Sequence, residues 1–157
     1  MRIVVLSDTH RDFYSLRKLV EKHRNDTQLF IHLGDGLQDL EQVRALYPKC
    51  SFLAVRGNCD FASTLPLAGF YAVESARIFY THGHLYNVKL EYAGLLQAAA
   101  ELDANVVLFG HTHQALHQYR KGVHLLNPGS LGMPQGDRTY GIVDVTPQGI
   151  VCFLAKL

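Results

Sequence analysis

Histidine, aspartate and asparagine side chains recur in short motifs along this chain. The motifs are Asp8-Thr9-His10, Gly34-Asp35, Gly57-Asn58 and Gly110-His111-Thr112-His113, and each follows a short apolar run that is typical of a buried strand. If these strands lie in one sheet, their carboxyl ends meet at a common edge. Oxygen and imidazole donors gathered at such an edge are what a two-metal centre requires. The sequence therefore predicts a metal site with two ions.

Taken singly, each motif is weak evidence for a metal. Gly34-Asp35 and Gly57-Asn58 are common turn pairs, although a glycine would also let the backbone turn and present a carboxylate to the site. Asp8 and His10 are two residues apart, so in extended backbone their side chains would point the same way.

The joint occurrence of the motifs is more specific. His82 ends the apolar run Ile78–Thr81, and His111 and His113 directly follow Val106–Phe109. Five separate strand ends that each carry a suitable ligand are hard to attribute to chance. The combination favours a metal centre over a set of unrelated turns.

Length and charge limit the class of protein. A chain of 157 residues with 48% hydrophobic residues can furnish one substantial core, and we expect residues 1–157 to form a single domain. The formal net charge is +1, and no run of Lys or Arg exceeds two residues. This argues against binding of long nucleic acid, which needs a broad basic surface. A small anionic substrate is compatible, because a metal pair supplies positive charge locally.

The sequence also predicts a location. Met1 leads directly into the strand-like Arg2–Leu6, which leaves no room for a signal peptide, and the longest apolar runs are far below the roughly 20 residues that span a bilayer. Three cysteines are an odd number, so a disulfide framework is not expected. We expect a soluble cytoplasmic protein with no membrane partner. A homo-oligomer, dimer or tetramer, is left open.

The order of expected elements indicates an α/β fold. Strands alternate with helices in the first half, which predicts a parallel sheet with right-handed crossovers, and two hairpins near the carboxyl end predict antiparallel strands. Together they indicate two sheets packed face to face with helices outside. Strands are expected at Ile3–Leu6, Leu29–Leu33, Phe52–Val55, Ile78–Thr81, Val106–Phe109, His117–Tyr119, Val123–Leu126, Tyr140–Val145 and Ile150–Leu154, and helices from Asp12 to about Arg24, at Leu37–Tyr47 and near Leu90–Leu102.

The ordered motifs resemble a known family. With His82-Gly83-His84 added, they are similar to those of the calcineurin-like metallophosphoesterase superfamily, and the likeness runs from Arg2 to about Asp144. The short length, Gly57–Asp60 and Asn127–Ser130 resemble its small bacterial and archaeal phosphodiesterase branch. The resemblance implies a four-layer α/β/β/α sandwich of two mixed sheets flanked by helices.

The resemblance also implies a ligand set and a reaction. It assigns one metal to Asp8, His10, Asp35 and His113, and a second to Asp35, Asn58, His82 and His111. It implies a small phosphodiester as substrate, attacked at phosphorus by a hydroxide that the metals share. Two divalent ions, two carboxylates and this hydroxide sum to one positive charge, which favours an anionic ester. Mn is the metal we expect, and Ni, Fe, Co or Zn also suit these donors.

One position departs from the family pattern. Many relatives carry a histidine, thought to contact the phosphate and protonate the leaving oxygen, where this chain has Cys59. A thiol is a less effective acid, so the enzyme would either prefer good leaving groups or take the proton elsewhere, with His84 as the nearest candidate. The implied catalytic residues are Asn58, Cys59 and His84. We expect Cys59 to lie beside the phosphate rather than to act as a nucleophile.

Other functions are compatible with the same fold. A phosphomonoesterase of the same mechanism cannot be separated by spacing. A protein-binding scaffold, as in eukaryotic trafficking complexes, is disfavoured because all seven ligand positions carry metal-binding side chains. A nuclease for long DNA would need additional regions. The loops Cys59–Gly69 and Gly132–Arg138 are expected to shape the substrate pocket. Packing, surface or turn roles are expected for His23, His32, His117, His124, Asn127–Ser130 and Arg138.

Overall fold

The computed structural model describes residues 1–133 and 136–157. Its strands are β1 (Arg2–Leu6), β2 (Leu29–His32), β3 (Phe52–Ala54), β4 (Ala68–Val73), β5 (Ala76–Thr81), β6 (Val106–Leu108), β7 (Ala115–Arg120), β8 (Val123–Pro128), β9 (Thr139–Thr146) and β10 (Gly149–Lys156). Its helices are α1 (Phe13–His23), α2 (Leu37–Leu46) and α3 (Ala93–Glu101), with a 3-10 turn, η1, at His84–Tyr86.

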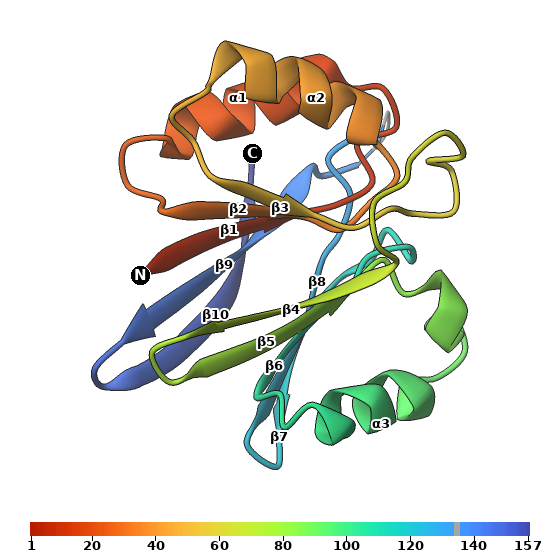
Figure 1. The fold of residues 1–157 in the computed structure, drawn as a ribbon, viewed down its shortest axis with the longest axis vertical. Helices are drawn as coiled ribbons and strands as arrows, with labels where there is room; N and C mark the ends of the chain where they lie inside the picture. The colour runs from red at the N-terminus through yellow and green to blue at the C-terminus, as the bar shows by residue number, and fades with distance from the viewer. Residues whose placement is uncertain (134–135) are drawn as a thin grey trace.

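Two mixed sheets of five strands face each other between layers of helix (Figure 1). The first has the order β10-β9-β1-β2-β3, in which β1, β2 and β3 are parallel and β9 is antiparallel to β1. The second has the order β4-β5-β6-β8-β7, in which β5, β6 and β8 are parallel and the two edge strands antiparallel. Helices α1 and α2 cover the first sheet and α3 covers the second (Figure 1). The predicted α/β/β/α sandwich is confirmed.

Alternating side chains of β1 supply two different layers of the core. Val5 lies between the sheets with Ile78, and Val4 on the other face of β1 packs in the layer with Leu16 of α1 and Leu40 of α2. All five side chains are fully buried. This period-two pattern holds β1 between a sheet and a helix layer, so its carboxyl end is fixed in position.

Helix α1 begins as the sequence indicates. The Asp12 carboxylate accepts the backbone N–H of Ser15 at 3.0 Å, which satisfies a donor that the first turn leaves free. Arg138 lies against the same carboxylate at 3.1 Å. Arg138 lies exposed in a loop, as expected, and its guanidinium also pairs with the helix cap.

Strand β4 was not expected from the sequence. It falls at the end of the loop predicted over Cys59–Gly69, and Ala68 and Gly69 carry no strand propensity. Gly69 is nonetheless required there, because a Cβ atom would overlap the ring of Tyr80 on the neighbouring strand. The second predicted loop, Gly132–Arg138, includes residues 134 and 135, which lie outside the described residues.

Two helix predictions need correction. The helix predicted at Leu37–Tyr47 would place Leu46 on its inward face, but α2 ends at this residue and Leu46 is 54% exposed. The third helix begins at Ala93 rather than near Leu90. Leu90 is 82% exposed and follows a turn in which Asn87 has a positive φ of 55°. Over the described residues, no helix has the length and apolar character that a membrane crossing requires.

Candidate metal centre

The side chains predicted as ligands gather where the strands of both sheets end. Five of them lie on residues with positive φ: Asp8 (55°), His10 (45°), Asp35 (57°), His111 (69°) and His113 (59°). The expectation that Asp8 and His10 converge from extended backbone is wrong, because both adopt the left-handed conformation. Non-glycine residues rarely do so, and such strain concentrates at functional sites.

Asp8, His10 and His113 form one group of donors. Asp8 Oδ1 lies 3.2 Å from His113 Nε2 and 3.7 Å from His10 Nε2, and the two ring nitrogens are 3.1 Å apart. The Asp8 side chain is fully buried, whereas each ring is about one-third exposed. The three donors therefore converge on one point. The two partly exposed rings leave this point accessible to solvent.

Asn58, His82 and Asp35 form a second group. His82 Nε2 lies 3.0 Å from Asn58 Oδ1 and 3.4 Å from Asp35 Oδ2. His82 Nδ1 donates to the carbonyl of Leu33 at 2.8 Å. Because a carbonyl can only accept, this bond places a hydrogen on Nδ1 and directs Nε2 into the cluster, where its lone pair would bind a cation. The ring of His111 lies 5.0 Å from that of His82, centroid to centroid.

Asp35 lies between the two groups. Its carboxylate has oxygen atoms within 4.8 Å of donor atoms of Asp8 and His82, and also of His10. One carboxylate is therefore close to donors from both sets. The structure brings all seven predicted ligands into one region, with donors from both sheets.

A glycine holds the Asp35 carboxylate in place. A Cβ atom on Gly57 would overlap Asp35 Oδ1, so only glycine allows the loop after β3 to approach this closely. The same carboxylate oxygen accepts the backbone N–H of Cys59 at 2.7 Å. Gly34, with φ of +99°, makes the turn that brings Asp35 toward that loop.

Asp60 has a role that the sequence reasoning missed. Its carboxylate accepts four backbone N–H groups, from Asp35 (2.7 Å), Gly36 (3.0 Å), Leu37 (3.0 Å) and Gly57 (2.8 Å). It therefore fastens the loop after β3 to the turn after β2 and to the start of α2, where negative charge is favoured. The sequence feature that could have indicated this role is an acidic residue three positions after Gly57.

Asn127–Ser130 has the structural role expected of it. Asn127 Nδ2 donates to the carbonyl of Gly110 at 3.0 Å, and its Oδ1 accepts the N–H of Gly129 at 2.9 Å. Ser130 Oγ donates to the carbonyl of Asp8 at 2.7 Å. This segment thus positions two of the motifs without presenting a donor to the cluster.

Burial and charge act in opposite directions on the carboxylates. Burial raises the pKa of Asp8, but contact with His113 and the charge of His82 outweigh it, so the pKa is lowered. Burial likewise opposes ionisation of Asp35, and its contacts with His82 and Cys59 outweigh it. Burial, and then the charge of His82, lower the pKa of His111 to about 4. Both carboxylates are charged and this imidazole is neutral at pH 7, which are the forms that bind metal.

The donor set fits divalent cations. Asp8 Oδ1 is buried and, apart from its 3.2 Å contact with His113 Nε2, has no hydrogen-bond partner among the described residues, which is costly for an ionised oxygen. A cation among the ring nitrogens beside it would satisfy that charge. Carboxylate, amide and imidazole donors suit first-row transition metals of borderline hardness.

The remaining predicted catalytic residues lie at the edge of this cluster. The thiol of Cys59 accepts a contact from Asn58 Nδ2 at 3.4 Å, and burial, followed by contact with Asp35, raises the pKa of the thiol to about 11. A protonated thiol is a weak nucleophile. The ring of His84 lies 5.4 Å from that of His82 and 6.2 Å from that of His111, centroid to centroid.

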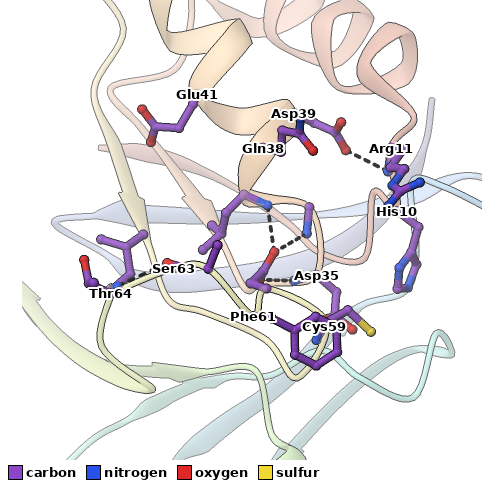
Figure 2. Close-up of a pocket in the computed structure, with 15 residues that line it drawn as sticks. His10, Arg11, Asp35, Gln38, Asp39, Glu41, Cys59, Phe61, Ser63 and Thr64 are labelled. Atoms are coloured by element: carbon purple, nitrogen blue, oxygen red, sulfur yellow. Dashed lines mark hydrogen bonds between the residues drawn. The ribbon is translucent and has the colours of Figure 1, made fainter.

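A cleft of about 980 Å³ opens beside the cluster (Figure 2). His10, Asp35 and Cys59 line it on one side, and the start of α2 lines it on another. Phe61 is 89% exposed, and Figure 2 shows its ring next to Asp35 and Cys59. Solvent-exposed apolar area therefore lies next to the clustered polar donors.

Known proteins resemble the chain in sequence and fold. A probable metallophosphoesterase of Bacillus subtilis, YsnB, is 34% identical over 139 residues, 88% of this chain and 80% of the relative. The Escherichia coli phosphodiesterase YfcE is 27% identical over 170 residues, covering 92% and 88% of the two chains. The crystal structure of a predicted phosphoesterase from Streptococcus pneumoniae has a TM-score of 0.79 at 25% identity, covering 98% and 97%.

One relative is named for vacuolar protein sorting and not as a phosphoesterase. Vacuolar protein sorting-associated protein 29 of Schizosaccharomyces pombe is 39% identical over 136 residues, 83% of this chain and 72% of the relative. The model of the calcineurin-like phosphoesterase superfamily domain matches residues 1–148, nearly the whole chain. The chain therefore belongs to the calcineurin-like phosphoesterase superfamily, and its relatives named metallophosphoesterase and phosphodiesterase support a phosphoric ester hydrolase that uses divalent metals.

Proposed function

We propose that this protein is a metal-dependent phosphodiesterase that cleaves small phosphodiesters at a centre for two divalent cations. In this proposal Asp8, His10, Asp35 and His113 hold one cation, and Asp35, Asn58, His82 and His111 hold the second. The observation that carries it is the Asp35 carboxylate, which lies within 4.8 Å of donors on both sides. A carboxylate in that position can serve both cations.

The protein itself supplies orientation and charge. The bond from His82 Nδ1 to the Leu33 carbonyl fixes which nitrogen faces the site, and the N–H of Cys59 restrains one Asp35 oxygen. When bound, the cations would supply positive charge against the phosphoryl oxygens and make nearby water more acidic. Mn²⁺ is the cation we expect, and the donors also suit Ni, Fe, Co or Zn.

The cleft supports a small substrate. It adjoins the cluster and ends at the start of α2, and the chain has a net charge of only +1, so long nucleic acid has no broad basic surface to follow. The residual positive charge of the loaded centre would favour an anionic diester. We propose that the protein acts in the cytoplasm.

The proton for the leaving oxygen is proposed to come from a group other than Cys59. A thiol is a poor acid for this step, and His84 lies beside His82 and His111. If no group supplies that proton, aryl diesters, whose leaving groups need little protonation, should react faster than alkyl diesters. Equal rates on matched aryl and alkyl diesters would contradict this leaving-group preference and favour a proton from another group such as His84.

Two other functions are tested by the same assay. A phosphomonoesterase would share the centre, and a scaffold is suggested by the 39% identity to a vacuolar sorting protein. The seven clustered donors favour the enzyme. We would compare kcat/KM for bis(p-nitrophenyl) phosphate and p-nitrophenyl phosphate with Mn²⁺ present. A diester-to-monoester ratio above one supports the proposal, a ratio below one identifies a monoesterase, and turnover of neither by folded protein favours the scaffold.

A further inference from the structure

A second group of potential ligands lies away from the centre described above. His117 of β7, His124 of β8 and Cys152 of β10 converge between the two sheets. His117 Nε2 and His124 Nδ1 are 3.1 Å apart, and one donor atom from each of the three residues lies within 4.8 Å of the others. Donors from both sheets therefore meet at one point.

The strand register places the two histidines on one face. Tyr119 of β7 pairs with His124 of β8, so His117, two residues before Tyr119, projects from the same face. The two imidazole rings are nearly parallel, at 10° and 5.4 Å between centroids. Strand β10 lies against β7 and β8, and Cys152 belongs to the core between the sheets with an exposed fraction of 5%.

This position suits a bound cation. Burial lowers the pKa of both histidines, which favours neutral rings that retain lone pairs. Burial raises the pKa of the Cys152 thiol to about 12, so this donor becomes a thiolate only when an ion binds. A cleft of about 480 Å³, lined by residues that include His124, Tyr119 and Ile150, adjoins the group. Of the three donors, His124 is the one that lines this cleft, so an ion at the site would be approached from the His124 side.

We propose that His117, His124 and Cys152 bind a single Zn²⁺ ion that links the two sheets. Imidazole and thiolate are both donors that Zn²⁺ accepts, and the soft sulfur distinguishes this site from the other centre, whose proposed ligands are imidazole nitrogens and oxygens. On binding, Zn²⁺ replaces the thiol proton of Cys152, which is released to solvent, and a Zn–S bond forms. The site does not depend on the proposed diesterase activity.

Cobalt spectroscopy tests the proposal. Co²⁺ occupies zinc sites, and a thiolate ligand gives it a near-ultraviolet charge-transfer band that nitrogen and oxygen donors do not give. Because Cys59 adjoins the other centre, the titrations are made in the Cys59→Ala background, where Cys152→Ala is compared with the control Cys50→Ala. We expect the band in Cys59→Ala and in the Cys59→Ala/Cys50→Ala variant, and its loss in the Cys59→Ala/Cys152→Ala variant. A band that persists in Cys59→Ala/Cys152→Ala, or that never forms in Cys59→Ala, would overturn the proposal.

A second variant guards against a folding defect in Cys152→Ala. His117 is only half-buried, and His117→Gln keeps a polar side chain of similar length. We expect His117→Gln to keep its circular dichroism spectrum and its diesterase activity while it loses the band and binds one fewer Zn²⁺ per chain by equilibrium dialysis. Wild-type zinc content in a folded His117→Gln variant would contradict the site.

Discussion

Asp60 holds the backbone of Asp35, accepting its N–H at 2.7 Å, while the Asp35 carboxylate turns toward the metal ligands. The same Asp60 carboxylate reaches Gly57 at 2.8 Å, so it joins the segments after two neighbouring strands. The proposed shared ligand is therefore positioned by an acidic residue that we do not expect to contact the cations. Removing the charge of Asp60 by substitution tests whether this positioning matters for stability and metal binding.

Asp60→Asn is expected to lower both stability and metal affinity. The amide keeps one acceptor oxygen but loses the charge and half of the acceptor capacity, so several N–H groups lose a partner. We expect a loss of about 2 kcal/mol in the free energy of unfolding, measured by urea denaturation. Asp103→Asn, at a side chain that is 87% exposed, is the control and should change it by less than about 0.5 kcal/mol. Equal stability of the two variants would contradict the role of Asp60.

Gly57→Ala is expected to displace the Asp35 carboxylate. The added Cβ would overlap Asp35 Oδ1, and the loop after β3 must shift to relieve it. Diester kcat/KM should fall by about 100-fold, because small displacements of catalytic ligands have large effects on rate. Gly94→Ala in α3, where the nearest atom lies 4.0 Å from the added Cβ, should keep wild-type activity. Wild-type kcat/KM in Gly57→Ala would show that Asp35 tolerates displacement.

Phe61→Ala is expected to raise KM for an aryl diester with a smaller effect on kcat. The exposed ring adjoins Asp35 and Cys59 in the cleft, so it can stack on an aromatic ester group (Figure 2). Such contacts contribute about 1 kcal/mol, which corresponds to roughly a fivefold change in KM. Tyr14→Ala, at a ring that is 79% exposed on α1, is the matched control. A similar KM in both variants would remove Phe61 from substrate binding.

Acid is expected to weaken the Arg2–Asp144 pair. The guanidinium of Arg2 contacts both Asp144 oxygens at 2.8 Å and lowers the pKa of that carboxyl. The pair therefore stabilises the fold above the unfolded pKa of about 4 and is lost as pH falls through the folded pKa. Both side chains are partly exposed, so we expect a contribution of about 1 kcal/mol or less.

Asp144→Asn measures that contribution. The free energy of unfolding should fall less steeply between about pH 5 and pH 2 in the variant than in the wild type. The two proteins should then differ more at pH 6 than at pH 2. Parallel curves would show that the pair contributes nothing to acid sensitivity.

The sequence predicted the layers and most strands because each is a strong local pattern. An apolar run such as Ile3–Leu6 predicts a buried strand from its own residues alone. Asp12 caps α1 by accepting a hydrogen bond from Ser15, only three residues along the chain. Strand β4 was not predicted although Phe70, Tyr71 and Val73 favour strands, because its first two residues, Ala68 and Gly69, do not. Its pairing with β5 also requires Gly69 to fit against Tyr80, a contact between separate strands that no local pattern marks.

In the candidate site, too, features with a local motif could be predicted, and contacts between distant segments could not. The convergence of the seven proposed ligands could be predicted, since each motif lies at a strand end, and the structure brings these side chains into one region; their metal binding stays a prediction. The left-handed backbone of Asp8 and His10 could not be predicted, because loops from several strands impose it. The four bonds to Asp60 and the meeting of His117 with Cys152 join distant segments, and no local pattern marks them.

Metal add-back to stripped protein tests the central claim most directly. The wild type and Asp35→Asn would be treated with chelator, dialysed, and assayed with bis(p-nitrophenyl) phosphate without metal and with increasing Mn²⁺, while bound manganese is measured. We expect no activity without metal, full activity at two bound Mn²⁺ per wild-type chain, and loss of both activity and at least one ion in Asp35→Asn. Diester hydrolysis by metal-free protein, or wild-type activity and manganese content in Asp35→Asn, would contradict a two-metal centre at these residues.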